Sequence, residues 1–95
     1  MAKQKHKAQV AEVLAQRGPK YGKFTDQAAV SQSLKHVMFN TPNWRNMAAD
    51  QREALEMVAM KISRVLCGDP DYADNFVDVA GYSTLVANRL LQEAE

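Results

Sequence analysis

Hydrophobic residues recur at helical spacing in four segments of the chain, and no stretch alternates apolar and polar residues as a strand would. The segments span roughly residues 4–16, 25–40, 50–67 and 70–95. Apolar residues three and four positions apart line one face of a helix, whereas a half-buried strand needs strict alternation. The pattern predicts an all-α fold, a small antiparallel bundle of about four helices. We expect the chain to form a single domain over residues 1–95, with a flexible basic start at residues 1–6.

Glycine and proline mark the expected ends of the first two helices. Gly18 and Pro19 should end the first helix and open a loop with the sequence RGPKYGKF at residues 17–24. Thr25 is a suitable N-cap for the second helix. Pro42 then favours an extended connector, because the residue before a proline avoids the helical region.

Acidic residues mark the expected starts of the third and fourth helices. Asp50 and Glu53 have the three-residue spacing of a capping box, and Gly68 should end the third helix. Asp71 and Asp74 fit the first turn of the fourth helix, where the helix dipole favours negative charge. These two helices carry the longest apolar stripes, which we expect to form the core. The stripe residues are Leu55, Val58, Ala59, Ile62, Val65 and Leu66 in the third helix, and Phe76, Val79, Ala80, Val86, Ala87, Leu90 and Leu91 in the fourth.

The composition is that of an ordinary soluble domain, with 46% hydrophobic and 24% charged residues. No apolar run is long enough to span a membrane. The net charge of +1 conceals a basic first quarter and an acidic last quarter. Such charged ends can pair with one another, or can divide a polyphosphate site into a metal side and a phosphate side. The single cysteine, Cys67, suggests a reducing compartment and hence the cytoplasm.

Asp78 is the acidic residue that helix capping does not explain. It lies inside the fourth helix with no lysine or arginine four residues away. If the last two helices form a hairpin, Asp78 can approach Glu56, and with Glu53 and Asp74 they offer carboxylate ligands for Mg²⁺. Alternatively, Asp78 pairs with Lys61 or Arg64 across the hairpin, a structural role that is more common than metal binding.

Basic residues around the two glycines of the expected loop are candidate phosphate ligands. The candidates are Arg17, Lys20 and Lys23, joined by Lys61 and Arg64 from the third helix, with Tyr21 and Tyr82 available to stack on a ligand. The alternative is a flexible connector with solvated lysines. Trp44 likewise either lines a pocket together with Phe39 or simply covers the core.

Three segments together resemble a known group of proteins: RGPKYGKF, DQREALEMVAMKISRVLCGDPDY and DNFVDVAGY. They are similar to a family of small proteins encoded by tailed phages and prophages. More remotely, the last two helices resemble the MazG-like all-α nucleoside triphosphate pyrophosphohydrolases. That group binds Mg²⁺ through a Glu-x-x-Glu helix and a following Glu-x-x-Asp helix. Glu53 and Glu56 match the first pattern; Asp78 matches the second, in which Asn75 replaces the expected glutamate.

These observations lead to two functional hypotheses. The first is a non-catalytic phage accessory protein, a helical homo-oligomer (a dimer or larger) that binds a host protein or a nucleotide in the host cytoplasm. Five methionines and helix faces of mixed character favour association. The second, which the resemblance implies, is a Mg²⁺-dependent pyrophosphohydrolase with Glu53, Glu56 and Asp78 as metal ligands. We do not expect nucleic-acid binding, because the basic start is short and has no interleaved aromatic residues.

Overall fold

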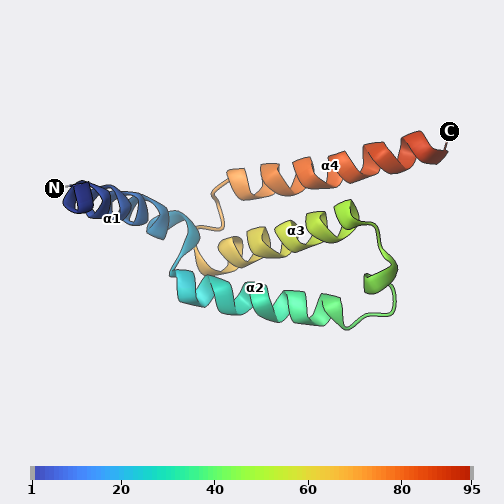
Figure 1. Cartoon of the computed structure of the whole chain (residues 1–95), viewed down its shortest axis with the longest axis horizontal. Helices are drawn as coiled ribbons and strands as arrows, with labels where there is room; N and C mark the ends of the chain where they lie inside the picture. Colours follow the sequence, from blue (N-terminus) through green and yellow to red (C-terminus); the bar gives the residue numbers. More distant parts are fainter. Residues whose placement is uncertain (1, 95) are drawn as a thin grey trace.

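The chain is all-α, as the sequence pattern predicts. The computed structural model describes the backbone of residues 2–94 and the side chains of residues 7 and 9–94. Four α-helices, α1 (Ala2–Tyr21), α2 (Phe24–Phe39), α3 (Ala49–Cys67) and α4 (Asp74–Ala94), and one 3₁₀ turn, η1 (Trp44–Asn46), make up the described part, which contains no strand (Figure 1). None of the described helices is both long and apolar enough to cross a membrane.

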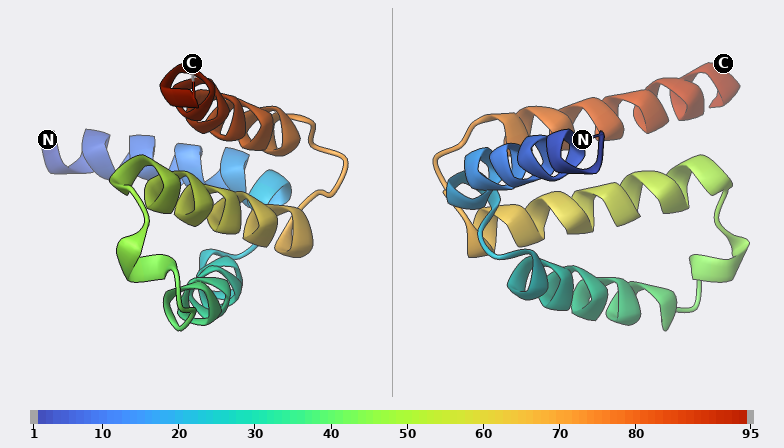
Figure 2. Two further views of the ribbon diagram at one scale, coloured as in Figure 1. Left: turned by 90° about the vertical axis from the view of Figure 1, so that its right-hand side faces the viewer. Right: turned by 60° about the vertical axis from the view of Figure 1, so that its left-hand side comes forward.

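The helix α3 is the centre of the arrangement. It packs against α2 on one side and against α4 on the other, and α2, α3 and α4 run antiparallel to one another in succession (Figures 1 and 2). The helix α1 contacts α2 and α3 near its C-terminal end, and its N-terminal end projects away from the other helices. The molecule is elongated as a result, with extents of 56 × 30 × 27 Å.

The first helix continues past the point where we expected it to end. Gly18 and Pro19 lie inside α1, which ends at Tyr21, so the expected loop at residues 17–24 is wrong over most of its length. Proline in a helix lacks the N–H that would bond the carbonyl four residues back, and its ring crowds that carbonyl. Only Lys20 and Tyr21 follow Pro19 in α1, so the disturbed turn is the last one of the helix. The N–H of Gly22 still donates to the carbonyl of Gly18 at 2.8 Å.

Gly22 is the residue that ends α1. Its φ angle of +79° lies in the left-handed region, which only glycine adopts without a penalty. A Cβ atom at this position would lie 2.1 Å from the carbonyl oxygen of Cys67. The carbonyl of Lys20 accepts a bond from the N–H of Asp69 at 3.0 Å. The C-terminal end of α1 is therefore docked on the turn between α3 and α4. Met1 and the side chains of residues 2–6, which carry the expected basic start, lie outside the described residues.

The N-caps of α2 and α3 lie two residues earlier than expected. Lys23, and not Thr25, is the N-cap residue of α2, which ends at Phe39 as predicted. At the start of α3 the N–H of Ala48 donates to the Oε1 atom of Gln51 at 2.9 Å. In a capping box, the side chain of the N3 residue accepts a hydrogen bond from the backbone N–H of the N-cap residue, and Gln51 and Ala48 make this bond here. The expected capping box of Asp50 and Glu53 is therefore wrong, and Glu53 has no capping role.

The helix α4 begins at Asp74, later than expected, and runs to Ala94. Asp71 lies in the preceding turn, where its N–H donates to Oδ1 of Asp69 at 2.9 Å. Asp74 alone among the expected capping acids is in the first turn of the helix. Asp78 therefore lies one turn inside α4.

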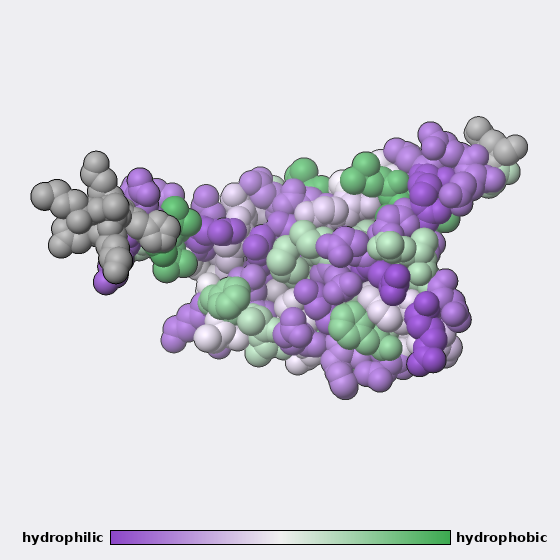
Figure 3. All heavy atoms as spheres, in the orientation of Figure 1, coloured by the Kyte–Doolittle hydropathy of each residue, from purple (hydrophilic) through white to green (hydrophobic). Residues whose placement is uncertain are grey.

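The predicted apolar core is not buried. Among the described side chains, Ala59 is the only fully buried hydrophobic residue, and the side chains of Leu66, Phe76 and Leu91 are more than half exposed. Hydrophobic side chains are visible at the surface along α4, among hydrophilic ones (Figure 3). The expected stripes on α3 and α4 exist, but other elements do not cover them.

Polar side chains occupy the contact between α3 and α4 instead. Asn75 of α4 is buried, Asp78 is bonded to Lys61, and Arg89 is bonded to Asp50. Ion pairs between the two helices select the face of α4 that meets α3, because a buried lysine requires a partner charge. The prediction that Phe76, Leu90 and Leu91 pack in the core was wrong for this reason.

Candidate functional site

Asp78 and Lys61 form an ion pair between α4 and α3. Their Oδ2 and Nζ atoms lie 2.8 Å apart, and only 9% of the Lys61 side chain is exposed. A buried ammonium group without a partner is costly, so the carboxylate of Asp78 stabilises Lys61 in this position. Of the two roles that the sequence left open for Asp78, the structure shows the cross-hairpin ion pair with Lys61.

The structure does not bring the four predicted metal ligands together. Glu53 and Glu56 lie on α3, whereas the carboxylate of Asp78 faces Lys61 and that of Asp74 accepts a hydrogen bond from the Tyr72 hydroxyl group, with the two oxygens 2.7 Å apart. Among the described residues, no group of three or more Asp, Glu, His or Cys side chains is placed to hold a metal ion. The donor set within one chain therefore does not fit Mg²⁺, which prefers several oxygen ligands in octahedral geometry. Metal binding at these residues stays a prediction.

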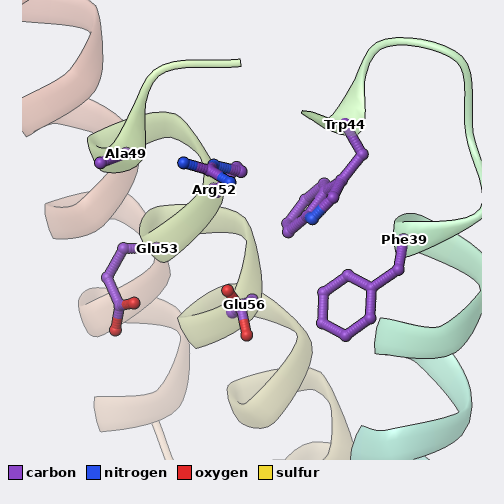
Figure 4. Close-up of a pocket in the computed structure, with 6 residues that line it drawn as sticks. All are labelled: Phe39, Trp44, Ala49, Arg52, Glu53 and Glu56. Atoms are coloured by element: carbon purple, nitrogen blue, oxygen red, sulfur yellow. The ribbon is translucent and has the colours of Figure 1, made fainter. Parts of the chain in front are cut away.

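Glu53 and Glu56 line a pocket of about 300 Å³ at the open end of the α2–α3 hairpin. The rings of Phe39 and Trp44, whose centroids are 5.0 Å apart, form its other wall. In Figure 4, Arg52 and Glu56 lie between Glu53 and these rings, and the Glu53 side chain is directed away from them. Trp44 and Phe39 do line a pocket together, one of the two roles that the sequence left open. We call this pocket the aromatic–acidic pocket.

A second pocket, of about 340 Å³, gathers predicted phosphate ligands. Arg17 and Lys23 reach it from the junction of α1 and α2, and Arg64 reaches it from the C-terminal half of α3. The rings of Tyr21 and Phe24 also line this pocket, and none of the acidic residues that the structure describes does. Three positive charges without a countercharge suit an anion, and arginine suits phosphate in particular. We call it the basic pocket.

Tyr21 holds the two arginines of the basic pocket. The guanidinium carbon of Arg64 lies 4.4 Å from the centre of the Tyr21 ring, and that of Arg17 lies 5.3 Å from it. Stacking on a ring orients a guanidinium group and leaves its N–H donors available. The Nε atom of Arg64 is buried and has no hydrogen-bond partner among the described residues. Tyr21 therefore positions the basic groups, where we expected it to stack on a ligand.

The remaining predicted residues lie outside the two pockets. Lys20 stacks on the ring of Tyr72, with its Nζ atom 5.0 Å from the ring centre. The hydrogen bond that Tyr72 donates to Asp74, together with burial, raises the pKa of Tyr72 to about 12. Tyr82 is half-buried on α4 and lines neither pocket. Lys61 is engaged by Asp78 and is not free to bind a phosphate.

Sequence reasoning did not identify Arg52 or Phe24 as pocket residues. Arg52 lines the aromatic–acidic pocket, and its buried Nε atom has no partner among the described residues. Phe24 lines the basic pocket with its ring largely exposed. The order glycine, lysine, phenylalanine at residues 22–24 was the available sequence signal for Phe24. Arg52 lies four residues before Glu56 on one helix face, a spacing that was also readable.

Comparison with known proteins gives one match. Residues 6–90 match a family model described as a domain of unknown function (DUF6378). No curated protein and no solved structure matches the chain significantly.

Proposed function

This chain belongs to the DUF6378 family, a domain of unknown function, and we propose a function for it from its own side chains. The chain forms a non-catalytic helical oligomer that binds a nucleotide through the phosphate groups of that nucleotide. The observation that carries the proposal is the basic pocket, in which Arg17, Lys23 and Arg64 converge without a countercharge. The sequence resemblance to phage proteins adds the setting, an accessory protein of a tailed phage or prophage acting in the host cytoplasm.

The basic pocket offers the two kinds of contact that a nucleotide needs. The guanidinium groups of Arg17 and Arg64, held by the Tyr21 ring, can donate paired hydrogen bonds to phosphate oxygens. Lys23, which is exposed, adds a third positive charge. The largely exposed ring of Phe24 provides a surface on which a base can stack, a contact that does not depend on the identity of the base.

The arrangement of the acidic residues supports a binding role without catalysis. Cleavage of a phosphate anhydride on the MazG-like pattern needs several carboxylates around a metal. Here Asp78 neutralises Lys61, and Asn75 replaces one of the carboxylates of that pattern. A bound nucleotide would therefore be held and not hydrolysed.

A thermal-shift experiment tests the proposal. We expect ATP and inorganic pyrophosphate, each with and without Mg²⁺ at constant ionic strength, to raise the Tm of the wild-type chain. Ligand at a hundred times its Kd adds about 2.7 kcal/mol to the free energy of unfolding, which gives a shift of several degrees. Arg64→Gln and Lys23→Gln should remove most of this shift.

The matched control is Arg45→Gln, which removes the same charge at an exposed position in η1, away from the basic pocket. It should retain the wild-type shift. Equal loss in Arg45→Gln and Arg64→Gln would show a general charge effect and contradict the site. No shift of the wild-type chain with any nucleotide would contradict nucleotide binding altogether.

The aromatic–acidic pocket favours a second candidate, a MazG-like pyrophosphohydrolase. Glu53 and Glu56 both line this pocket, at the positions that match the Glu-x-x-Glu pattern, beside two aromatic rings and Arg52. This candidate predicts that pyrophosphate is released from a nucleoside triphosphate in the presence of Mg²⁺ or Mn²⁺, and that Glu56→Gln abolishes the release. Turnover of this kind would replace the non-catalytic proposal.

A further inference from the structure

A continuous apolar face lies along one side of the α3–α4 hairpin. Two grooves of about 300 and 280 Å³ run along both helices and share Val58. The larger hydrophobic residues of α3 and α4 that line them, which we call the apolar face, are Leu55, Val58, Ile62, Val65, Leu66, Phe76, Val79 and Val86.

The residues of the apolar face follow the spacing of helices that pack against further helices. In α3 they occur at positions 55, 58, 62, 65 and 66, and in α4 at positions 76, 79 and 86, with Ser83 also lining the groove between the last two. Steps of three and four residues make the seam that another helix fills in coiled coils and bundles. Within the described chain, α2 packs on a different side of α3, and the apolar face is left uncovered.

The surface area of the chain is larger than that of a stable monomer of its size. The solvent-accessible area is 7211 Å² for a mass of 10.6 kDa. The scaling law for folded monomers gives about 5,500 Å², so the excess is about 1,700 Å². Obligate homodimers bury about 2,000 Å² or more in total, or about 1,000 Å² for each chain. The excess is larger than this requirement, and part of it belongs to the projecting α1.

The charges at the apolar face suit a second copy of the same chain. Lys61 is the one charged residue among those that line the two grooves, and its charge is already paired with Asp78. Two copies can therefore meet without repulsion between like charges. A highly charged peptide would find no countercharge on this face.

We propose that a second copy of this chain packs its apolar face against this one about a two-fold axis, so that α3 and α4 of both copies form a four-helix bundle. The shared core would then contain the two sets of stripe residues that each chain leaves exposed. This inference names the interface of the oligomer in the proposed function. It rests on the oligomeric part of that function and not on nucleotide binding.

Two neighbouring residues of α4 provide a matched test. Phe76 belongs to the apolar face and its side chain is 59% exposed, whereas Val77 lines neither groove and is 64% exposed. In sedimentation velocity the wild-type protein should sediment as a particle of twice the mass of one chain, which is 10.6 kDa. Phe76→Asp should sediment as a monomer, and Val77→Asp should remain a dimer. A monomeric wild-type chain at high concentration, or a dimeric Phe76→Asp, would overturn the proposal.

A milder pair of variants covers the case in which Phe76→Asp loses its helical circular dichroism. Phe76→Ala should raise the dimer Kd about tenfold or more, as truncation of a large interface residue does, and Val77→Ala should leave the Kd nearly unchanged. Equal effects at the two positions would contradict the proposed face. The thermal shift with ATP separates the two proposals: a dimer that shows no shift would retain this interface and contradict nucleotide binding. A monomeric wild-type chain that shows a shift would support nucleotide binding and contradict this interface.

Discussion

At the scale of single residues, polar side chains determine which faces of the helices meet. The side chain of Lys61 is almost entirely buried between α3 and α4, and it is acceptable there because Asp78 lies 2.8 Å away. Asn75, which is 1% exposed, occupies the same contact, and its Nδ2 atom has no hydrogen-bond partner among the described residues. Side chains of this kind are costly to bury, so they constrain the packing more tightly than apolar residues of similar size.

Removing Asp78 should therefore cost more than removing the charge of Lys61. Asp78→Ala leaves a buried, unpaired ammonium group and should lower the free energy of unfolding by about 1–2 kcal/mol, a value reduced by the partial exposure of the pair. Lys61→Met keeps the apolar stem and should change the stability by less than about 1 kcal/mol. Urea denaturation at one fixed protein concentration measures both.

The double variant provides the control for this ion pair. Lys61→Met combined with Asp78→Ala should be more stable than Asp78→Ala alone, because no buried charge is left unpaired. A larger loss for Lys61→Met than for Asp78→Ala would mean that Asp78 does not compensate the charge of Lys61.

At the scale of the elements, contacts at the helix ends hold the helices together. The C-terminal end of α1 is seated on the α3–α4 turn through Gly22, Gly68 and the bond from Asp69 to Lys20. At the far end of the hairpin, Arg89 of α4 donates a hydrogen bond to Asp50 of α3 at 2.7 Å and also bonds Glu93. Each of these two contacts between helix ends depends on a few specific groups, so single substitutions should break it.

Gly22→Ala should weaken the contact between the C-terminal end of α1 and the α3–α4 turn. The position has a φ angle of +79°, and the new Cβ atom would clash with the backbone of Cys67, so we expect a loss of about 1–3 kcal/mol. Gly18→Ala is the matched control, because its Cβ would meet nothing within 4 Å and it lies inside the helix. It should be neutral or more stable by up to about 1 kcal/mol. Thermal denaturation distinguishes the two outcomes, and equal stability of the two variants would contradict this contact.

The Asp50–Arg89 pair should make stability depend on pH in the acidic range. The hydrogen bond from the Arg89 guanidinium group holds the pKa of Asp50 below its ordinary value of 3.8. Since the pKa is lower in the folded state, the pair stabilises the fold above that value, and its contribution is lost as the pH falls below 3.8 through the folded-state pKa. Asp50→Asn should therefore be less stable than the wild-type chain at neutral pH, with a difference that shrinks below pH 3.8. For Arg89→Gln, the difference from the wild-type chain in the free energy of unfolding, measured by urea titration, should shrink over the same pH range. A difference that is independent of pH would contradict the role of the Asp50–Arg89 pair.

At the scale of the whole molecule, the chain resembles half of a bundle. Three helices lie side by side, and the most regular apolar stripes face outward along α3 and α4. The fully buried residues of the described part include several polar ones and, among hydrophobic residues, Ala59 alone. A domain of this length has little core to spare, so pairing with a second copy would add most of the missing apolar burial.

The stability of the chain should therefore increase with protein concentration. If folding and dimerisation are coupled, raising the concentration from about 1 to about 100 µM should raise the Tm by several degrees through mass action. Phe76→Asp should have a lower Tm that does not change with concentration, and Val77→Asp should behave like the wild-type chain. Scanning calorimetry over this range provides the measurement. A constant Tm in the wild-type chain would contradict coupled dimerisation.

The sequence by itself determined the fold class, the approximate helices and some residues of both pockets. Helix periodicity depends on neighbours along the chain, so the ends of α2 at Phe39 and of α3 at Cys67 were predictable, as was the candidate pair of Phe39 and Trp44. Only the tertiary structure decided that α1 continues through Pro19 and that Asp78 pairs with Lys61. It also decided that the apolar stripes of α3 and α4 face outward. The physical reason is that a stripe shows which side of a helix avoids water, whereas the neighbour that covers it is chosen by long-range contacts, such as the buried ion pair and the contact of α1 with the α3–α4 turn.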